Sequence, residues 1–276
     1  MTPLNDIRSS LGEGAFWHPL RQEFFWFDIT GQKLHSLART WDFPEMVSAM
    51  GWISQREVMI GTEHRLLRFN LDTGTSTTVC ELESNNAITR SNDGRADPQG
   101  GFWISTMGKQ IEPHQGSIWR YWRGELRQLF TGLSIPNAIS FTPDGQTACF
   151  TDTPTRQLMQ VPLDASGWPI GEPVCWLDLT AEALNPDGAV FDAQGQLWVA
   201  QWGAGRIACY TRTGQLVDTI AVPTPCVSCP AFGGPHLNQL FCTTAIEDTN
   251  DPLAGASFVI SLATQGQAEH AVLMEA

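Results

Sequence analysis

The sequence predicts an all-β fold, a six-bladed β-propeller with four-stranded antiparallel blades, and two observations support this prediction. First, helical periodicity is hard to find, whereas short β-rich runs bounded by Gly, Asp and Pro occur throughout the chain. Second, one pattern recurs six times: an apolar residue, a turn, an alternating strand and then another short strand or two. A repeat of about 40–45 residues with four strands per unit is typical of a β-propeller.

The six copies follow one another along the chain, at residues 16–37, 51–74, 95–129, 140–167, 190–220 and 231–262. Their equivalent apolar positions lie 35, 44, 45, 50 and 41 residues apart and are Trp17, Trp52, Ala96, Phe141, Phe191 and Phe232. Because no blade can bury both its faces alone, we expect one domain covering residues 1–276. The same packing predicts that tryptophans wedge between blades, namely Trp103, Trp119, Trp176, Trp198 and Trp202.

Composition restricts the partners and the compartment. The net charge of −13 argues against nucleic acid as a partner, because phosphate binding needs a basic face. The chain has no run of 18 apolar residues and no basic patch followed by an apolar stretch near its start, so we expect neither a membrane span nor a signal peptide. Seven cysteines at irregular positions indicate buried thiols in a cytoplasmic protein. The sequence leaves open whether the protein is a monomer or a homodimer.

The cysteine pair Cys226 and Cys229 forms a single C-x-x-C motif. A zinc site would need a second pair or nearby histidines, and neither is present in the sequence around it. A redox motif would need a strand followed by a helix, which this part of the sequence does not predict. We therefore interpret the pair as structural.

Polar residues recur at one place in the repeat, four residues before each equivalent apolar position. They are Glu13, Asn92, Asn137 and Asp187, with Ser48 and Ser228 in the remaining two blades. Since the first strand of each propeller blade lines the central channel, these side chains should converge at its mouth. Any one of them could instead bond a turn, as Asn and Asp often do. Two carboxylates facing each other across a dry channel, however, would repel unless a cation lay between them.

Carboxylate and amide oxygens are hard ligands, suited to Ca²⁺, Mg²⁺ or Mn²⁺. Three or four such oxygens leave coordination positions open, as a catalytic metal requires. The sequence thus predicts one divalent metal ion in the channel, with Ca²⁺ expected first and Zn²⁺, Mn²⁺, Mg²⁺ or Fe²⁺ as alternatives.

Several segments together resemble the SMP-30/gluconolactonase/luciferin-regenerating-enzyme family of six-bladed sugar lactonases. They are LGEGAFWHP, RSNDGRADPQGGFWISTMG, HQGSIWR, IPNAISFTPDG, NPDGAVFDAQGQLWVAQWGAGRI and CPAFGG, and they extend over nearly the whole chain. The resemblance implies that Glu13, Asn137 and Asp187 are the metal ligands and that Asp187 also accepts and donates the proton. It implies that Arg90 and Asn92 bind the substrate.

The sequence departs from the family pattern after Met107, where the family often carries an acidic residue that meets the sugar. Here Lys109 and Gln110 stand in that place. Lys109 is interpreted as a solvated loop residue, although it could also attract an acidic sugar lactone. His114, in the family-like HQG, is expected to make a contact within the blades.

The function implied is metal-dependent hydrolysis of a sugar lactone, an aldonolactone, to the corresponding sugar acid. Neither a Ser-His-Asp arrangement nor a Gly-x-Ser-x-Gly elbow is visible, which argues against a covalent acyl-enzyme. Two alternatives remain open at this stage. One is a metal-dependent esterase or phosphotriesterase of the same propeller type, and the other is a non-catalytic, calcium-binding regulatory propeller.

Overall fold

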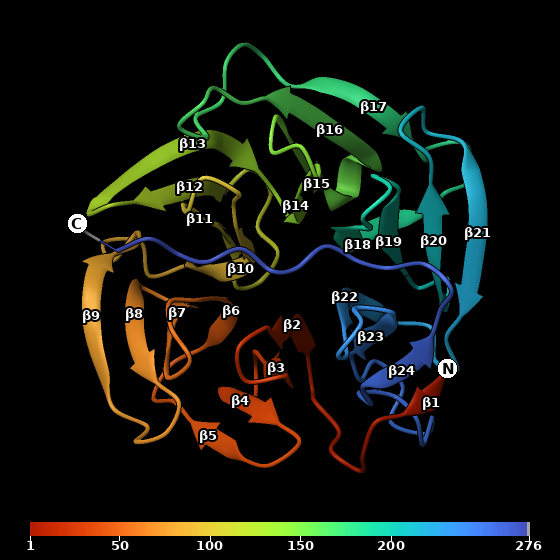
Figure 1. The fold of residues 1–276 in the computed structure, drawn as a ribbon, viewed down its shortest axis with the longest axis horizontal. Helices are drawn as coiled ribbons and strands as arrows, with labels where there is room; N and C mark the ends of the chain where they lie inside the picture. Colours follow the sequence, from red (N-terminus) through yellow and green to blue (C-terminus); the bar gives the residue numbers. More distant parts are fainter. Residues whose placement is uncertain (275–276) are drawn as a thin grey trace.

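The computed structural model describes residues 1–274 as six four-stranded antiparallel sheets around a central axis (Figure 1). The first blade contains β2 (Gly12–His18), β3 (Glu23–Asp28), β4 (Lys33–Ser36) and β5 (Thr40–Asp42). The second contains β6 (Val47–Trp52), β7 (Glu57–Thr62), β8 (Arg65–Asn70) and β9 (Ser76–Glu81). The third contains β10 (Thr89–Ala96), β11 (Phe102–Gly108), β12 (Gly116–Trp122) and β13 (Glu125–Leu133).

The fourth blade contains β14 (Pro136–Phe141), β15 (Thr147–Asp152), β16 (Gln157–Pro162) and β17 (Val174–Asp178). The fifth contains β18 (Asn185–Phe191), β19 (Leu197–Trp202), β20 (Arg206–Tyr210) and β21 (Leu216–Ala221). The sixth contains β22 (Val227–Gly233), β23 (Gln239–Thr244), β24 (Phe258–Ser261) and β1 (Thr2–Pro3). The predicted fold class is confirmed. Within residues 1–274 the only helix is the 3₁₀ turn η1 (Thr153–Thr155), and no helix there is long and apolar enough to cross a membrane.

The first strands of the blades form the inner ring. Each of β2, β6, β10, β14, β18 and β22 contacts its two neighbours in turn around the axis, and their side chains are almost all buried. The fourth strands lie at the outside, where β9, β13 and β21 are largely exposed. Residues near the start of different first strands therefore meet at one end of the channel, although they are far apart in the sequence.

A repeated turn anchors the inner strands to the second strands in two blades. Asp97 Oδ1 accepts the backbone N–H groups of the turn after β10, while its Oδ2 accepts the Trp103 indole N–H at 3.1 Å. Asp192 bonds its own turn and the Trp198 indole in the same way, at 3.0 Å. Both tryptophans are buried, so their packing role agrees with the prediction.

The ring closes through the N-terminus. Thr2 of β1 pairs with Val259 of β24, so that the first residues of the chain supply the outermost strand of the last blade. Figure 1 shows β1 beside β24, with the N-terminus at the edge of the molecule.

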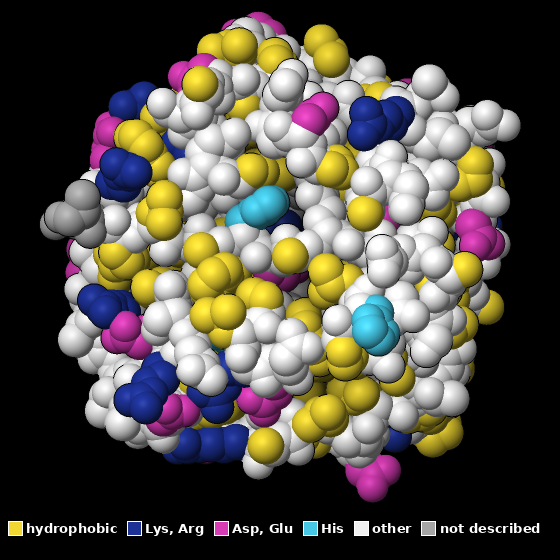
Figure 2. Space-filling view, viewed as in Figure 1, with side chains coloured by type: hydrophobic (Ala, Val, Ile, Leu, Met, Phe, Trp, Pro, Cys, Tyr) yellow, Lys and Arg dark blue, Asp and Glu magenta, His cyan; other side chains and the backbone are white. Residues whose placement is uncertain are grey.

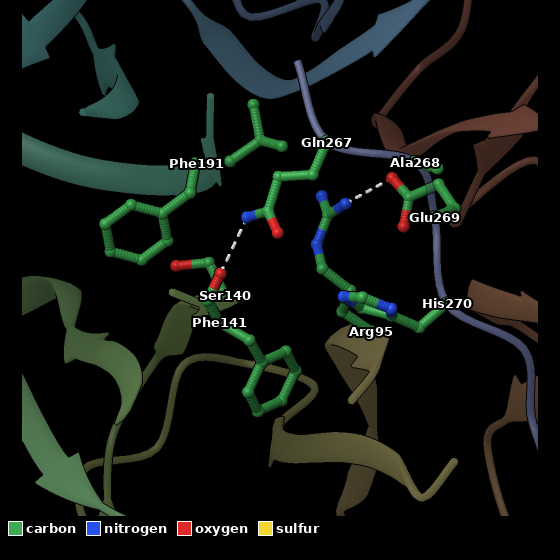
Figure 3. A pocket seen from close by; sticks show the side chains of 9 residues that line it. Arg95, Ser140, Phe141, Phe191, Gln267, Ala268, Glu269 and His270 are labelled. Atoms are coloured by element: carbon green, nitrogen blue, oxygen red, sulfur yellow. Dashed lines mark hydrogen bonds and ion pairs between the residues drawn. The ribbon is translucent and has the colours of Figure 1, made fainter. Parts of the chain in front are cut away.

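The segment after β24, residues 265–273, crosses one end of the channel, and we call it the C-terminal strap (Figure 1). Its backbone bonds Ala193, Trp52 and Gly100, which lie at or beyond the ends of three inner strands. Figure 3 shows its side chains over the channel: Gln267 donates to the Phe141 carbonyl, and Glu269 pairs with Arg95. Figure 2 shows that charged side chains lie mainly toward the edge of this face. The strap covers the end of the channel opposite to the starts of the inner strands.

Candidate active site

A pocket of about 340 Å³ opens where the inner strands begin. Five residues selected from the sequence line this one pocket, namely Glu13, Arg90, Asn92, Asn137 and Asp187. All five side chains are buried, with less than a tenth of their surface exposed. The structure therefore brings together side chains from β2, β10, β14 and β18. The two serines from the same place in the repeat do not line it, because Ser48 bonds Ser91 and Ser228 bonds the Gly12 carbonyl.

Local breaks in strand pairing set the direction of these side chains. Pairing between β2 and β3 shifts after Glu13, and pairing between β14 and β15 shifts after Asn137. The next residue, Gly14 or Ala138, has φ of +56° in both cases. Asn92 and Asp187 lie instead inside the unpaired segments of their bulges. The common offset read from the sequence thus covers two different strand registers.

Polar contacts connect three of the five residues. Arg90 Nη1 donates to Asn92 Oδ1 at 2.9 Å, so these two side chains lie on the same side of β10, as their spacing predicts. Asn92 Nδ2 in turn donates to Asn137 Oδ1 at 3.0 Å. Asn137 Nδ2 donates to Thr153 Oγ1 of η1 at 3.1 Å. Both amides are thereby fixed in orientation, with the Asn137 oxygen on the side of Asn92.

Three of the five pocket residues, Glu13, Arg90 and Asp187, are buried ionisable groups. Burial raises the pKa of Glu13 to about 8, and repulsion from Asp93 adds to this shift. Burial and the neighbouring Glu13 raise the pKa of Asp187 well above its usual range. Burial lowers the pKa of Arg90 to about 10, although Glu13 and Asp187 act in the opposite direction. One guanidinium therefore faces two carboxylates that repel each other.

The carboxylates of Glu13 and Asp187 repel each other, and a cation bound between them would remove this repulsion. Asp187 Oδ1 is buried and has no hydrogen-bond partner among the described residues. Within residues 1–274, the one hydrogen bond to the Glu13 carboxylate comes from the backbone N–H of Gly14, at 3.1 Å. Residues 1–274 hold no group of three or more His, Cys, Asp or Glu side chains arranged for a metal, so a site here must include the amide oxygen of Asn137. Two carboxylates and one amide oxygen form a set of hard ligands suited to a divalent ion.

Three residues of the pocket wall lie outside the predicted set of site residues. Trp202 is the first of them. Lys109 also lines the pocket, where it pairs with Glu63 of the second blade and donates to the Ala87 carbonyl at 2.9 Å, so it is not simply a solvated loop residue. Glu247 accepts the Cys226 thiol, which places one member of the C-x-x-C motif beside the pocket. Both cysteines of that motif are free.

The SMP-30/Gluconolactonase/LRE-like region family model matches residues 11–246. The chain belongs to this family. It is 31% identical to the L-arabinolactonase of Azospirillum brasilense over 97% of this chain and 93% of that protein. It is 29% identical to the 6-deoxy-6-sulfogluconolactonase of Pseudomonas putida over 95% and 94%. The structure of regucalcin from Agrobacterium tumefaciens, a calcium-binding protein, superimposes with a TM-score of 0.95 at 36% identity, covering 98% of this chain and 96% of that one.

Proposed function

We propose that the protein hydrolyses a sugar lactone, an aldonolactone, to the corresponding sugar acid in a metal-dependent reaction. The observation that carries this proposal is the convergence of Glu13, Arg90, Asn92, Asn137 and Asp187 on one buried pocket. The family relatives named L-arabinolactonase and 6-deoxy-6-sulfogluconolactonase support the reaction class. The seven free cysteines are compatible with a reducing, cytoplasmic location.

Glu13, Asn137 and Asp187 would hold the cation, and Ca²⁺ is the first expectation because the regucalcin relative is named a calcium-binding protein. The bound ion would supply Lewis-acid polarisation of the lactone carbonyl. The unpartnered Asp187 oxygen and the poorly satisfied Glu13 carboxylate support this ligand set. Asn137 contributes its amide oxygen, which Asn92 and Thr153 keep oriented.

Asp187 is the candidate general base. Its carboxylate would take a proton from the attacking water as the new C–O bond forms at the carbonyl carbon. The same proton would pass to the ring oxygen when the ring C–O bond breaks. This leaves a hydroxyl group and a carboxylic acid, which then releases its proton to solvent as the carboxylate forms. Arg90 uses one guanidinium nitrogen for the Ser91 carbonyl and Asn92, so its other N–H groups would bind sugar hydroxyls or the developing oxyanion. The Asn92 amide N–H groups already bond the Pro136 carbonyl and Asn137, so Asn92 would bind a sugar hydroxyl through its amide oxygen.

The test is acid release from a panel of five- and six-membered aldonolactones, with Ca²⁺, Zn²⁺, Mn²⁺, Mg²⁺ or Fe²⁺ added after chelation. At least one lactone should be hydrolysed well above its spontaneous rate, and Asp187→Asn should abolish this activity. No hydrolysis of any lactone with any of these ions would reject the proposal. Aryl esters and phosphotriesters in the same assay test the esterase alternative.

The regucalcin relative also favours a second candidate, a calcium-binding propeller without catalysis. Chelation separates the two. Removal of a purely structural ion would lower the thermal stability of a protein that hydrolyses no lactone. Removal of a catalytic ion would also abolish lactone hydrolysis, while the circular dichroism spectrum of the propeller stays unchanged.

A further inference from the structure

The bottom of the candidate pocket, which we call its floor, is polar, whereas most of the residues in its walls are apolar. The five polar residues lie at the starts of inner strands, and apolar side chains line the walls around them. These come from all of the first five blades and the loops that lead into them: Leu11, Met46, Met107, Ile111, Ile135 and Trp202. A lactone bound with its carbonyl at the floor would therefore place its other end among apolar groups.

Two polar groups in the walls are committed to the protein. Lys109 pairs with Glu63 and bonds the Ala87 carbonyl. Thr153 Oγ1 donates to the Pro186 carbonyl at 2.8 Å and accepts from Asn137. A sugar hydroxyl brought beside these two groups would lose its water without gaining a partner from either, which is costly for the bound state.

Ile111 provides an independent observation. It lies in the loop between β11 and β12 with 59% of its surface exposed, so packing in the core does not account for it. Its φ is +61°, a conformation that β-branched residues rarely adopt. The Ile111 N–H bonds the Gly108 carbonyl at 3.0 Å, and the Lys109 N–H bonds the Ile88 carbonyl at 2.8 Å, so the turn is held in place. Strained residues held in this way are concentrated at ligand-binding sites.

We propose that the preferred substrate is a neutral deoxy-aldonolactone, whose terminal carbon is a methyl group where the parent sugar has CH₂OH, and that Ile111 contacts this end. This inference rests on the proposed lactonase function and specifies its substrate class. The methyl group would be buried against apolar side chains, whereas the hydroxyl of the parent would be left unpaired. Since Glu63 neutralises Lys109, the walls offer no free cation to an acidic lactone.

The test uses pairs of lactones that differ only at the terminal carbon: L-rhamnono- and L-mannono-1,4-lactone, and D-fucono- and D-galactono-1,4-lactone. For the stereoisomer that is turned over, kcat/KM should be about tenfold or more higher for the deoxy member. Most of this difference should appear in KM, because the terminal carbon does not take part in the reaction. D-glucaro-1,4-lactone serves as the anionic comparison and should be a poorer substrate than either neutral member.

Ile111→Asn tests the residue, because Asn tolerates a positive φ while removing the apolar contact. It should reduce the deoxy preference to about twofold or less. His114→Asn is the matched control: His114 lies in the same loop with φ of +60°, but its ring bonds the Gly132 carbonyl at 3.0 Å. This variant should keep the full preference.

Equal kcat/KM for both members of the pair, or a preference for the anionic lactone, would overturn the substrate class. An unchanged preference in Ile111→Asn would overturn the role of Ile111. Failure of the proposed function has a different signature, in which no lactone of the panel is hydrolysed with any ion.

Discussion

The raised pKa of Glu13 predicts that cation binding and pH are coupled. The pKa of this carboxyl rises from 4.5 to about 8 in the cation-free protein, mainly because of burial and then because of Asp93. The ionised form is therefore disfavoured by folding. Its contribution to stability is complete below pH 4.5 and is lost as the pH rises toward 8. At pH 7, which is 2.5 pH units above the ordinary pKa of 4.5, the stability lost in this way is about 3 kcal/mol.

A divalent ion that binds Glu13, Asn137 and Asp187 would remove this cost by favouring both ionised carboxylates. Ion binding at pH 7 should then release at least one proton, since Glu13 is still protonated in the free protein. The apparent affinity should rise about tenfold per pH unit between pH 6 and 8. Thermal unfolding with and without the ion should show a larger stabilisation at pH 8 than at pH 6.

Calorimetric titration of Ca²⁺, Mg²⁺, Mn²⁺ and Zn²⁺ in two buffers of different ionisation enthalpy measures the released protons directly. Glu13→Gln is the control, because it preserves the side-chain shape while removing one titrating group. It should bind the ion more weakly, with fewer protons released, and its stability without ion should change less from pH 5 to pH 8. Binding that releases no proton in the wild-type protein would refute this reasoning.

Three further predictions concern other residues. Asn92→Ala should leave metal affinity nearly unchanged, because Thr153 still orients Asn137, and should lower kcat/KM by the equivalent of about 1–3 kcal/mol in transition-state free energy. Asp187→Ala should instead lose metal binding and turnover together. Equal loss of metal in both variants would make Asn92 a ligand. Burial lowers the pKa of His18 from 6.5 to about 4, so the stability that it contributes is present above pH 6.5 and lost as the pH falls toward 4, up to about 3 kcal/mol. Urea unfolding should show a smaller loss between pH 8 and 5 in His18→Gln, and an equal loss would contradict this. Gly14→Ala should destabilise the fold by about 2–4 kcal/mol, because its φ is +56° and an added Cβ would meet a backbone oxygen at 2.2 Å. Gly132→Ala is the control, because Gly132 has φ of +76° but open space around it, and it should cost about 1 kcal/mol in the same unfolding measurement. Similar losses in the two variants would show that backbone strain alone, and not the steric clash, determines the cost.

The fold was predictable because all six blades are four-stranded antiparallel sheets, so the same strand pattern recurs in the sequence once per blade. The equivalent positions Trp52, Ala96, Phe141 and Phe191 are the last residues of their inner strands. Counting back four residues from the equivalent positions reached a pocket residue in blades one, three, four and five, whereas Ser48 and Ser228 of the other two blades do not line the pocket. This is why residues as distant as Glu13 and Asp187 could be placed in one pocket from the sequence alone.

The finer geometry could not be predicted in this way. Whether a residue pairs or lies inside a bulge depends on backbone angles, such as the positive φ of Ala138, which no side-chain pattern indicates. The Lys109–Glu63 pair joins two different blades and has no periodic signal. The C-terminal strap also lies outside the repeat, so its contact with Arg95 depends on tertiary packing alone.

The closure of the ring by β1 has a consequence for synthesis of the chain. Thr2 and Val259 are 257 residues apart, so the sixth blade cannot be completed until nearly the whole protein has left the ribosome. Contacts over such distances slow folding, because the chain must lose much of its freedom before they form. Until then β24 is an open strand edge, to which another nascent chain could add. Pairing of Thr2 and Pro3 with Val259 and Phe258 then covers part of this edge.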